Sequence, residues 1–289
     1  MAAREAVIEV RSLSRTFGEQ MVLQGLSLDV FRGEILVVMG GSGCGKSTLL
    51  RHLVGELQPS SGSIAVFGVD LASANEWRMD EIRKKFGMLF QSGALFNSMT
   101  VAENVSLPLR EHTSLDPAII DIQVKINLER VGLREHADKY PAELSGGMKK
   151  RAGLARALAL DPQVLFYDEP SAGLDPVTSA EIDQLIIKLS RDLGVTSVVV
   201  THEMDSAFTI ADRMCMLDRG RALRIGTRGE FDDLRKLDGP AAASLSESDQ
   251  IIRQFLRGDA EGPLSARRTA ADFIEDVLGG GSSRRRGWT

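Results

Sequence analysis

The chain has 289 residues, of which 43% are hydrophobic and 26% are charged, so it is long enough for one large domain with an extension. Its formal net charge of -5 provides no general basic face, which argues against nucleic acid as a partner. Cys44 and Cys215 have no metal-ligand spacing, which argues against zinc and disulfides and fits a reducing cytosol. The N-terminus does not resemble a secretory signal, and no apolar run reaches the length of about 18 residues that a membrane span needs.

The first segment, residues 7–31, alternates between apolar and polar residues on both sides of a turn. We expect a strand at residues 7–10, a turn at 17–20 and a second strand at 22–30. Phe17 lies just before that turn. An aromatic ring at this place can stack on a nucleotide base or pack in the core of a small sheet, and composition alone favours the core role.

A glycine-rich loop follows the apolar run at residues 35–39 and leads into a predicted helix. It contains the spacing G-x-x-x-x-G-K-[ST] of a phosphate-binding loop. Its nucleotide-binding residues are Gly40, Gly41, Ser42, Gly43, Cys44, Gly45, Lys46, Ser47 and Thr48. Glycines let successive backbone N–H groups turn toward an anion, and the start of the helix adds its positive dipole end. We expect Lys46 to reach the β- and γ-phosphates and the Ser47 hydroxyl to bind Mg²⁺, so the chain should bind a nucleoside triphosphate.

Residues 58–62 interrupt this pattern, a strand is expected at 63–68, and residues 71–85 are charged and helical. A short apolar strand over residues 87–90 then ends on Gln91. In nucleotide-binding folds the ligand collects at the carboxyl ends of strands, so this glutamine is a candidate site residue.

From residue 92 to about 151 the pattern changes to helices and loops. We expect a helix at 101–109 that ends at Pro108, and an amphipathic helix at 117–131. Leu144, Ser145, Gly146, Gly147 and Met148 then open a long helix with a basic start. Serine and glycines at a helix N-terminus make a second candidate anion site.

Two carboxylates, Asp168 and Glu169, follow the apolar strand 164–167. At the edge of a sheet that carries a phosphate loop, Asp168 would lie near Mg²⁺ and Glu169 near an attacking water. A turn at 171–176, an apolar helical stripe at 182–193 and a buried strand at 197–201 come next, and the strand ends on His202. A hairpin over 214–225 closes this part of the chain, and we expect the polar strand ends to converge.

These motifs, in this order and at this spacing, make residues 7–230 resemble the ATP-binding cassette (ABC) ATPase family. Gln91 matches the Q-loop, Leu144 to Met148 the signature, Asp168 and Glu169 the magnesium-binding and catalytic acids, Asp175 the D-loop, and His202 the switch histidine. Phe17 lies where the family has its adenine-stacking aromatic. The resemblance implies catalytic roles for Glu169, His202 and Gln91, and a magnesium site formed by Ser47, Gln91 and Asp168.

The resemblance also implies the fold class, which is α/β: a P-loop ATPase core with an antiparallel β subdomain, an inserted helical subdomain at about 92–153 and a C-terminal extension. The ATPase domain is expected at 7–238 and the extension at 239–289. Two copies would form a head-to-tail dimer, in which Ser145, Gly146, Gly147 and Met148 of one copy contact the ATP held by Lys46 of the other.

The signature ends in Met148, where the family usually has glutamine. Met148, the segment 89–96 and the segment 253–263 are similar to the branch that powers Mla-type transporters, which are associated with Mce-domain proteins and move phospholipid between bacterial membranes. The resemblance therefore implies ATP and Mg²⁺ as cofactors, separate permease subunits, an Mce-domain protein and a peripheral place on the cytoplasmic face of the inner membrane. The surface around residues 91–103 would receive a helix of the permease.

Three alternatives stay open: an importer of amino acids or other small solutes, a non-transport ABC ATPase of translation or DNA repair, and a P-loop kinase. Phe255 and Leu256 either bridge two copies or pack within their own chain. In the last part of the chain we expect a short helix at 271–278, a glycine- and serine-rich linker at 279–283 and a disordered end. Arg284 to Arg286 and Trp288 are a weaker candidate for contact with lipid headgroups.

Overall fold

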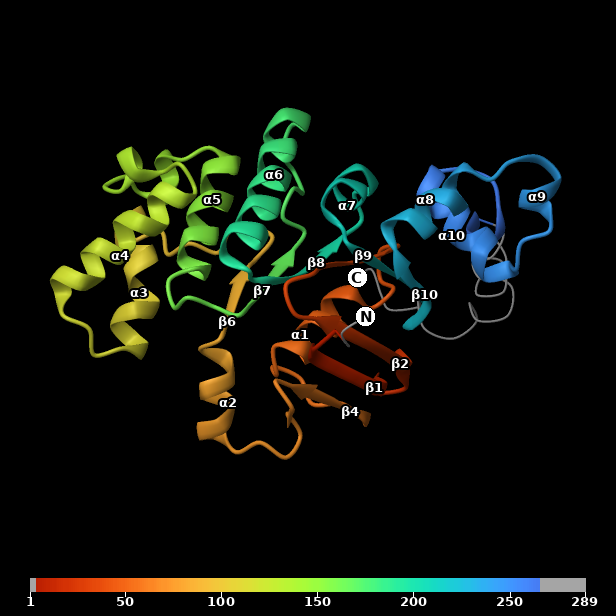
Figure 1. Ribbon diagram of the computed structural model, residues 1–289, viewed down its shortest axis with the longest axis horizontal. Coiled ribbons are helices and arrows are strands. Elements are labelled where there is room, and N and C mark those ends of the chain that lie inside the picture. The colour runs from red at the N-terminus through yellow and green to blue at the C-terminus, as the bar shows by residue number, and fades with distance from the viewer. Residues whose placement is uncertain (1–3, 266–289) are drawn as a thin grey trace, which may run out of the picture. The chain divides into compact units, whose positions relative to one another are not determined.

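The computed structural model describes residues 4–265. The chain divides into two compact units between Arg228 and Gly229, and the domain boundary expected from the sequence lies nearby, at residue 238. Figure 1 shows the elements of each unit. Among residues 4–265, no helix combines the length and the hydropathy needed to cross a bilayer.

A six-stranded sheet forms the centre of the first unit, with the order β10-β9-β3-β8-β7-β6. All neighbours in it pair in parallel except β9 and β10, which form the expected closing hairpin. The middle strands are apolar on both faces because helices or a second sheet cover both sides. The strands are β3 (Ile35–Gly40), β6 (Phe86–Leu89), β7 (Val164–Asp168), β8 (Thr196–Thr201), β9 (Arg213–Asp218) and β10 (Arg221–Thr227).

The second sheet of this unit is antiparallel and has the order β2-β1-β4-β5. It confirms the strands and the turn that the alternating pattern of residues 7–31 predicts. Its strands are β1 (Ala6–Phe17), β2 (Gln20–Phe31), β4 (Ser61–Val66) and β5 (Val69–Asp70).

Apart from α2, the helices of the first unit fall into two groups (Figure 1). Helices α3, α4 and α5 contact one another and form the inserted helical part, while α1, α6 and α7 contact the six-stranded sheet or each other. The helices are α1 (Lys46–Leu53), α2 (Glu76–Arg83), α3 (Val101–His112), α4 (Pro117–Arg130), α5 (Gly146–Ala157), α6 (Pro176–Leu193) and α7 (Met204–Ile210). Two short 3-10 turns, η1 (Arg134–His136) and η2 (Pro141–Glu143), lie between α4 and α5.

Helix α3 corrects one expectation, because it continues through Pro108 to His112. Proline removes one backbone donor, but the helix is fixed at both ends. Thr100 and Glu103 form a capping box at its start, and the Thr113 hydroxyl donates to the carbonyl of Leu109 at its end over 2.6 Å. Packing against α4 and α5 therefore outweighs the local cost of the proline.

The core of the first unit follows the two-residue period of the central strands. Val38 of β3 and Phe166 of β7 face a buried cluster that also contains Leu49 of α1 and the inner side chains of the antiparallel sheet. Phe86 meets Phe166 edge to face, with ring centroids 5.1 Å apart. This packing fixes the strands whose carboxyl ends carry the candidate site.

The second unit contains α8 (Arg228–Lys236), α9 (Gly239–Ala243) and α10 (Glu247–Arg257), with only the first residue of α8 before the boundary. Ser246 caps the start of α10 and Gly258, in the left-handed region, ends it. Leu256 is buried within the chain and Phe255 is half-buried. The Leu256 side chain therefore packs within its own chain, and only part of Phe255 is accessible to a second copy. The predictions for residues 271–278, 279–283 and 284–288 lie outside the described residues.

Candidate functional site

The phosphate loop connects β3 to α1 at the carboxyl edge of the six-stranded sheet. Lys46 is buried, and its Nζ atom donates hydrogen bonds to the carbonyls of Gly40 at 2.8 Å and Gly41 at 3.1 Å. The lysine amine thus lies over its own loop, where it could form an ion pair with a phosphate bound there. Burial raises the pKa of the Cys44 thiol, so this cysteine stays protonated and acts as a small packing residue.

Two glycines of this loop are required by their surroundings. Gly40 has φ 152°, and a Cβ atom there would lie 2.2 Å from the carbonyl oxygen of Leu217. Gly45 has φ 108°, and a Cβ atom would lie 2.9 Å from Cδ2 of Leu23. The loop is therefore packed tightly from outside, which leaves its backbone fixed in the curled form that a phosphate needs.

Asp168 ends β7, two strands from β3 in the sheet, and lies half-buried at the same edge. Burial raises the pKa of its carboxyl, the neighbouring Glu169 raises it further, and Lys150 and Lys46 act in the opposite direction. β7 and β3 are both parallel to β8, which lies between them, so Asp168 and the phosphate loop lie at strand ends on the same edge of the sheet. Burial of a carboxyl beside cations at a strand end is the arrangement found at metal and catalytic sites.

Glu169 and His202 contact each other directly. Oε1 of Glu169 lies 2.9 Å from Nδ1 of His202, and the backbone N–H of His202 donates to Oε2 over 3.3 Å. The Glu169 side chain is only 12% exposed, whereas that of His202 is 57% exposed, so the histidine covers a largely buried carboxylate. Glu169 has φ 49°, in the left-handed region that non-glycine residues rarely adopt, and such strain is frequent at functional sites.

Gln91 follows the end of β6 and is exposed to solvent. Arg156 of α5 holds the loop after it, because its guanidinium donates to the carbonyls of Gly93 at 3.0 Å and Ala94 at 2.8 Å. Gln91 follows β6, the strand next to β7 in the sheet. The loop that contains it is held by Arg156 of the helical part.

The signature residues lie at the start of α5, beside the D-loop. The Ser145 hydroxyl accepts a hydrogen bond from the Met148 N–H at 3.2 Å and caps the helix. A Cβ atom on Gly147 would lie 2.4 Å from Cγ2 of Thr178, so the helix start is in tight contact with α6. The sequence places this segment about 100 residues after Lys46, whose amine donates to carbonyls of its own loop.

The D-loop residue Asp175 caps α6. Its carboxylate accepts hydrogen bonds from the N–H groups of Val177 and Thr178, each at 3.1 Å, and from the Thr178 hydroxyl at 2.6 Å. The hydrogen bond from the Thr178 hydroxyl is the main reason that the pKa of Asp175 is lowered, so the side chain is ionised and fixed beside the signature helix.

Sequence reasoning missed several buried polar residues around this site. Lys150 is only 4% exposed, and its Nζ atom donates to the carbonyl oxygen of Glu169 at 2.9 Å. Ser206 donates to the buried Asp183 at 2.7 Å and lies 3.3 Å from the Ser171 hydroxyl, which links the D-loop to α6 and α7. The spacing of Lys150 between Gly147 and Leu154 places it on the buried face of α5, a signal that the sequence already contains.

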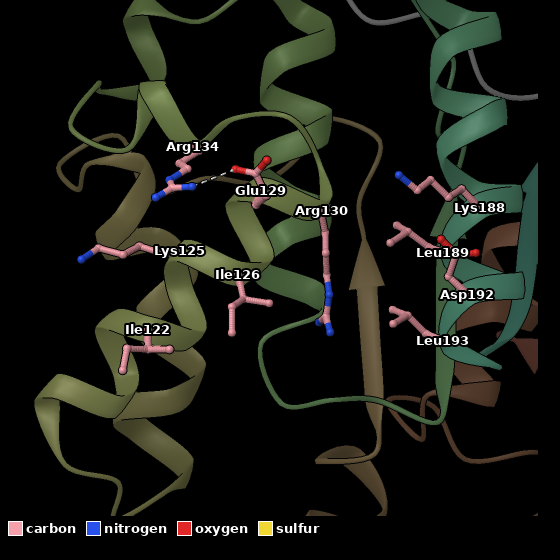
Figure 2. Close-up of a pocket in the computed structure, with 10 residues that line it drawn as sticks. All are labelled: Ile122, Lys125, Ile126, Glu129, Arg130, Arg134, Lys188, Leu189, Asp192 and Leu193. Atoms are coloured by element: carbon pink, nitrogen blue, oxygen red, sulfur yellow. Dashed lines mark ion pairs between the residues drawn. The ribbon is translucent and has the colours of Figure 1, made fainter.

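The cavity drawn in Figure 2 lies elsewhere, between α4 and α6. It has a volume of about 590 Å³, and Ile122 and Ile126 of α4 lie opposite Leu189 and Leu193 of α6 across it. None of the residues predicted to bind nucleotide or metal lines it. An anion site built from backbone N–H groups and a helix N-terminus needs no enclosed cavity, so the phosphate loop cannot be identified by cavity volume.

The side chains that the sequence predicts as magnesium ligands suit that ion. They are the hydroxyl of Ser47, the carboxylate of Asp168 and the side-chain amide of Gln91, all hard oxygen ligands. Within residues 4–265 there is no group of three or more His, Cys, Asp or Glu side chains that could hold a metal. Mg²⁺ is usually held by one or two protein carboxylates together with the phosphates of its nucleotide.

Comparison with protein families and known proteins adds to this geometry. The family model described as "ABC transporter" matches residues 23–172. The chain is 41% identical over 274 residues to the intermembrane phospholipid transport system ATP-binding protein MlaF of Escherichia coli K12, covering 95% of this chain and 97% of that protein. It is also 42% identical over 257 residues to the probable ribonucleotide transport ATP-binding protein mkl of Mycobacterium leprae, covering 89% of this chain and 70% of that protein.

The solved structures give the same fold. One is the dimeric structure of a post-hydrolysis state of an ATP-binding cassette bound to ADP and Pi, with a TM-score of 0.70 and 30% sequence identity. The similarity covers 76% of this chain and 98% of that one. The α/β fold expected from the sequence is therefore confirmed.

Proposed function

Because this chain belongs to the ABC transporter family and is an ATP-hydrolysing subunit, we propose that it drives a phospholipid transporter that works between bacterial membranes. The observation that carries this proposal is the similarity to the phospholipid transport protein MlaF, which extends over 95% of the chain and includes the second unit. The phosphate loop with Lys46 binds ATP, and hydrolysis at the adjacent sheet edge supplies the free energy for transport.

The active form is a head-to-tail dimer of two copies. Lys46 donates to carbonyls of its own loop, while Ser145 caps the start of α5, where the positive end of the helix dipole suits an anion. In the dimer this helix end closes on the γ-phosphate held by Lys46 of the other copy. The dimeric cassette with ADP and Pi, 30% identical to this chain, supports this arrangement.

Glu169 orients or deprotonates the attacking water, since its carboxylate lies at the sheet edge beside the phosphate loop. His202 holds that carboxylate through its ring nitrogen and extends toward the place of the transferring phosphoryl group. Lys46 stabilises the charge that develops on the phosphate oxygens. Ser47, Asp168 and Gln91 hold Mg²⁺, which neutralises phosphate charge when it is bound.

Phe17 is the proposed partner of the adenine ring. It is 41% exposed, and the Arg15 guanidinium lies 4.5 Å from the ring centroid on one face. The aromatic ring is thus available at the surface near the end of β1, as a stacking residue must be.

A groove near Gln91 is the proposed docking place for a separate membrane permease. It has a volume of about 490 Å³ and includes Phe90 and Phe96, which are 42% and 51% exposed. Large exposed aromatic side chains beside a cavity are typical of interaction sites. An Mce-domain protein is the proposed lipid-binding partner, and the assembly lies at the cytoplasmic face of the inner membrane.

The experiment that tests the transport proposal is purification of the tagged chain from its own membranes in mild detergent, with mass spectrometry of proteins and lipids. A polytopic permease, an Mce-domain protein and bound phospholipid would support the proposal. A permease that arrives with a solute-binding protein, or that transports nucleotides in vesicles, would favour the second candidate, a small-solute importer, for which the similarity to the mycobacterial protein argues. Absence of any permease would refute the transport role.

The hydrolytic role is tested by Glu169→Gln. The variant should bind ATP normally and form a stable dimer, while the turnover number falls by about 100-fold or more because the carboxylate base is lost. Normal turnover in this variant would remove Glu169 from the mechanism.

A further inference from the structure

We propose that Lys150 is a positioning residue for hydrolysis, which holds the backbone of Glu169 so that the carboxylate faces His202 and the attacking water. This inference rests on the proposed role of Glu169. Lys150 comes from the signature helix α5, and its side chain crosses to the end of β7. It is not proposed as a ligand of the nucleotide.

The backbone of Glu169 is held at both ends. Its N–H group donates to the carbonyl of Val200 in β8 at 2.9 Å, and its own carbonyl accepts the hydrogen bond from Lys150 at 2.9 Å. Between these two contacts the residue has φ 49°, a conformation that a side chain other than glycine adopts only when its surroundings impose it. Loss of the lysine contact would free the peptide to relax, and the carboxylate would turn away from His202.

A buried lysine at this place needs an electrostatic reason, because burial lowers the pKa of its amine and disfavours its charge. The negative charges of Asp168, Glu169 and Glu203 act in the opposite direction and favour the charged form of the amine. The positive charge of Lys150 thus offsets part of the negative charge of the carboxylates at this sheet edge. Its amine donates to a backbone carbonyl, and we do not assign it to a phosphate.

The contact also connects two parts of the proposed reaction cycle. Ser145 at the start of α5 belongs to the segment that meets ATP on the other copy, and Lys150 lies on the next turns of the same helix. A displacement of α5 therefore reaches Glu169 through one hydrogen bond. In this way closure of one nucleotide site would adjust the geometry of the base in the chain that carries the signature.

The test compares Lys150→Met, Lys150→Arg and Lys150→Gln with a matched control, Lys149→Met. Lys149 is the neighbouring lysine on the same helix and is less buried. Its variant removes one positive charge and leaves the hydrogen bond from Lys150 to Glu169 in place. For each protein we would measure kcat and KM for ATP, the affinity for ADP, and hydrogen exchange of a peptide that contains Glu169, without nucleotide.

We expect kcat of Lys150→Met to fall by about 100-fold, as for a misplaced catalytic group, with KM and ADP affinity within about three-fold of the wild type. The Glu169 peptide should exchange faster in this variant. Arg, and in part Gln, should restore kcat because both side chains donate to a carbonyl. Lys149→Met should match the wild type in all readouts.

Unchanged kcat and unchanged exchange in Lys150→Met would overturn the proposal. A joint loss of kcat and of ADP affinity that Arg fails to rescue would also overturn it. This pattern would indicate that Lys150 only supports the local structure. If the Met variant does not fold, Lys150→Leu, which also lacks a hydrogen-bond donor, gives the same comparison. A result in which Glu169→Gln abolishes hydrolysis but Lys150→Met does not would refute this inference alone; if Glu169→Gln stays active, the proposed role of Glu169 fails first.

Discussion

The ion pair between Glu34 and Arg213 offers a quantitative test of how the central sheet is held. Glu34 precedes β3 and is 6% exposed; Arg213 begins β9, and its Nη1 atom lies 2.9 Å from Oε1 of Glu34. The Phe31 N–H also donates to Glu34 at 2.9 Å, and the Arg213 guanidinium lies 4.8 Å from the centroid of the Phe31 ring. The pair therefore joins the strand that carries the phosphate loop to its neighbour β9.

We expect Arg213→Met to lower the free energy of unfolding by about 3–5 kcal/mol near neutral pH, since it leaves a buried carboxylate without its partner. Burial raises the pKa of Glu34, while the Phe31 N–H and Arg213 lower it, so the variant raises this pKa further. A carboxyl whose pKa is higher in the folded than in the unfolded state favours folding at low pH, and this contribution is lost as the pH rises through the folded pKa. The cost of the variant should therefore shrink as the pH falls from about 7.5 to about 5.5.

The assay is guanidinium unfolding followed by circular dichroism at both pH values. In the double variant Glu34→Gln and Arg213→Met the extra pH dependence should disappear, because the Glu34 carboxyl that titrates in the single variant has been removed. Arg51→Met removes the exposed pair with Glu56 and should leave the free energy of unfolding nearly unchanged. A cost for Arg213→Met below 1 kcal/mol, or one that is equal at the two pH values, would refute the reasoning.

Three further predictions concern the site and the core. Lys46→Ala should weaken ATP binding by about 1.5–3 kcal/mol, the value of a charged hydrogen bond; unchanged affinity in titration calorimetry would contradict the phosphate-loop assignment. Phe166→Ala should cost about 3–5 kcal/mol of unfolding free energy because the ring is fully buried, whereas Trp77→Ala, at a side chain that is 68% exposed, should cost less than about 0.5 kcal/mol. Gly87→Ala should cost about 1–3 kcal/mol, because its Cβ atom would lie 2.3 Å from the carbonyl oxygen of Ala157; full stability in thermal unfolding would show that β6 and α5 can move apart.

The sequence predicts the fold and much of the candidate site because its signals are local. Apolar runs that end in polar residues indicate buried parallel strands, and the carboxyl ends of such strands share one edge. Hence the proximity of Glu169 and His202 follows from the pattern, and the structure records their contact at 2.9 Å. Pro108 misled the prediction of a helix end, since only the packing of α3 shows why the helix continues.

Other parts of the site could not be predicted because they depend on contacts between distant elements. Lys150 belongs to a basic run that is usually solvated, and only the position of α5 against β7 brings its amine to the Glu169 carbonyl. The buried chain of Asp183, Ser206 and Ser171 joins three segments that the sequence separates. Such hydrogen bonds have no period and no spacing rule, so they appear only in three dimensions.

The pairing of β6 with β7 has a consequence for how such a protein can change. These strands are neighbours in register, with Met88 opposite Phe166, although the whole helical part of the unit lies between them in the chain. That part leaves and re-enters the sheet at adjacent positions, as an insertion does. Its exposed surface can therefore be exchanged or reshaped by evolution or by grafting to suit a new partner, while the hydrolytic edge keeps its spacing. The exception is the start of α5, where Lys150 ties the insertion to Glu169, so a viable graft would have to begin and end outside that contact.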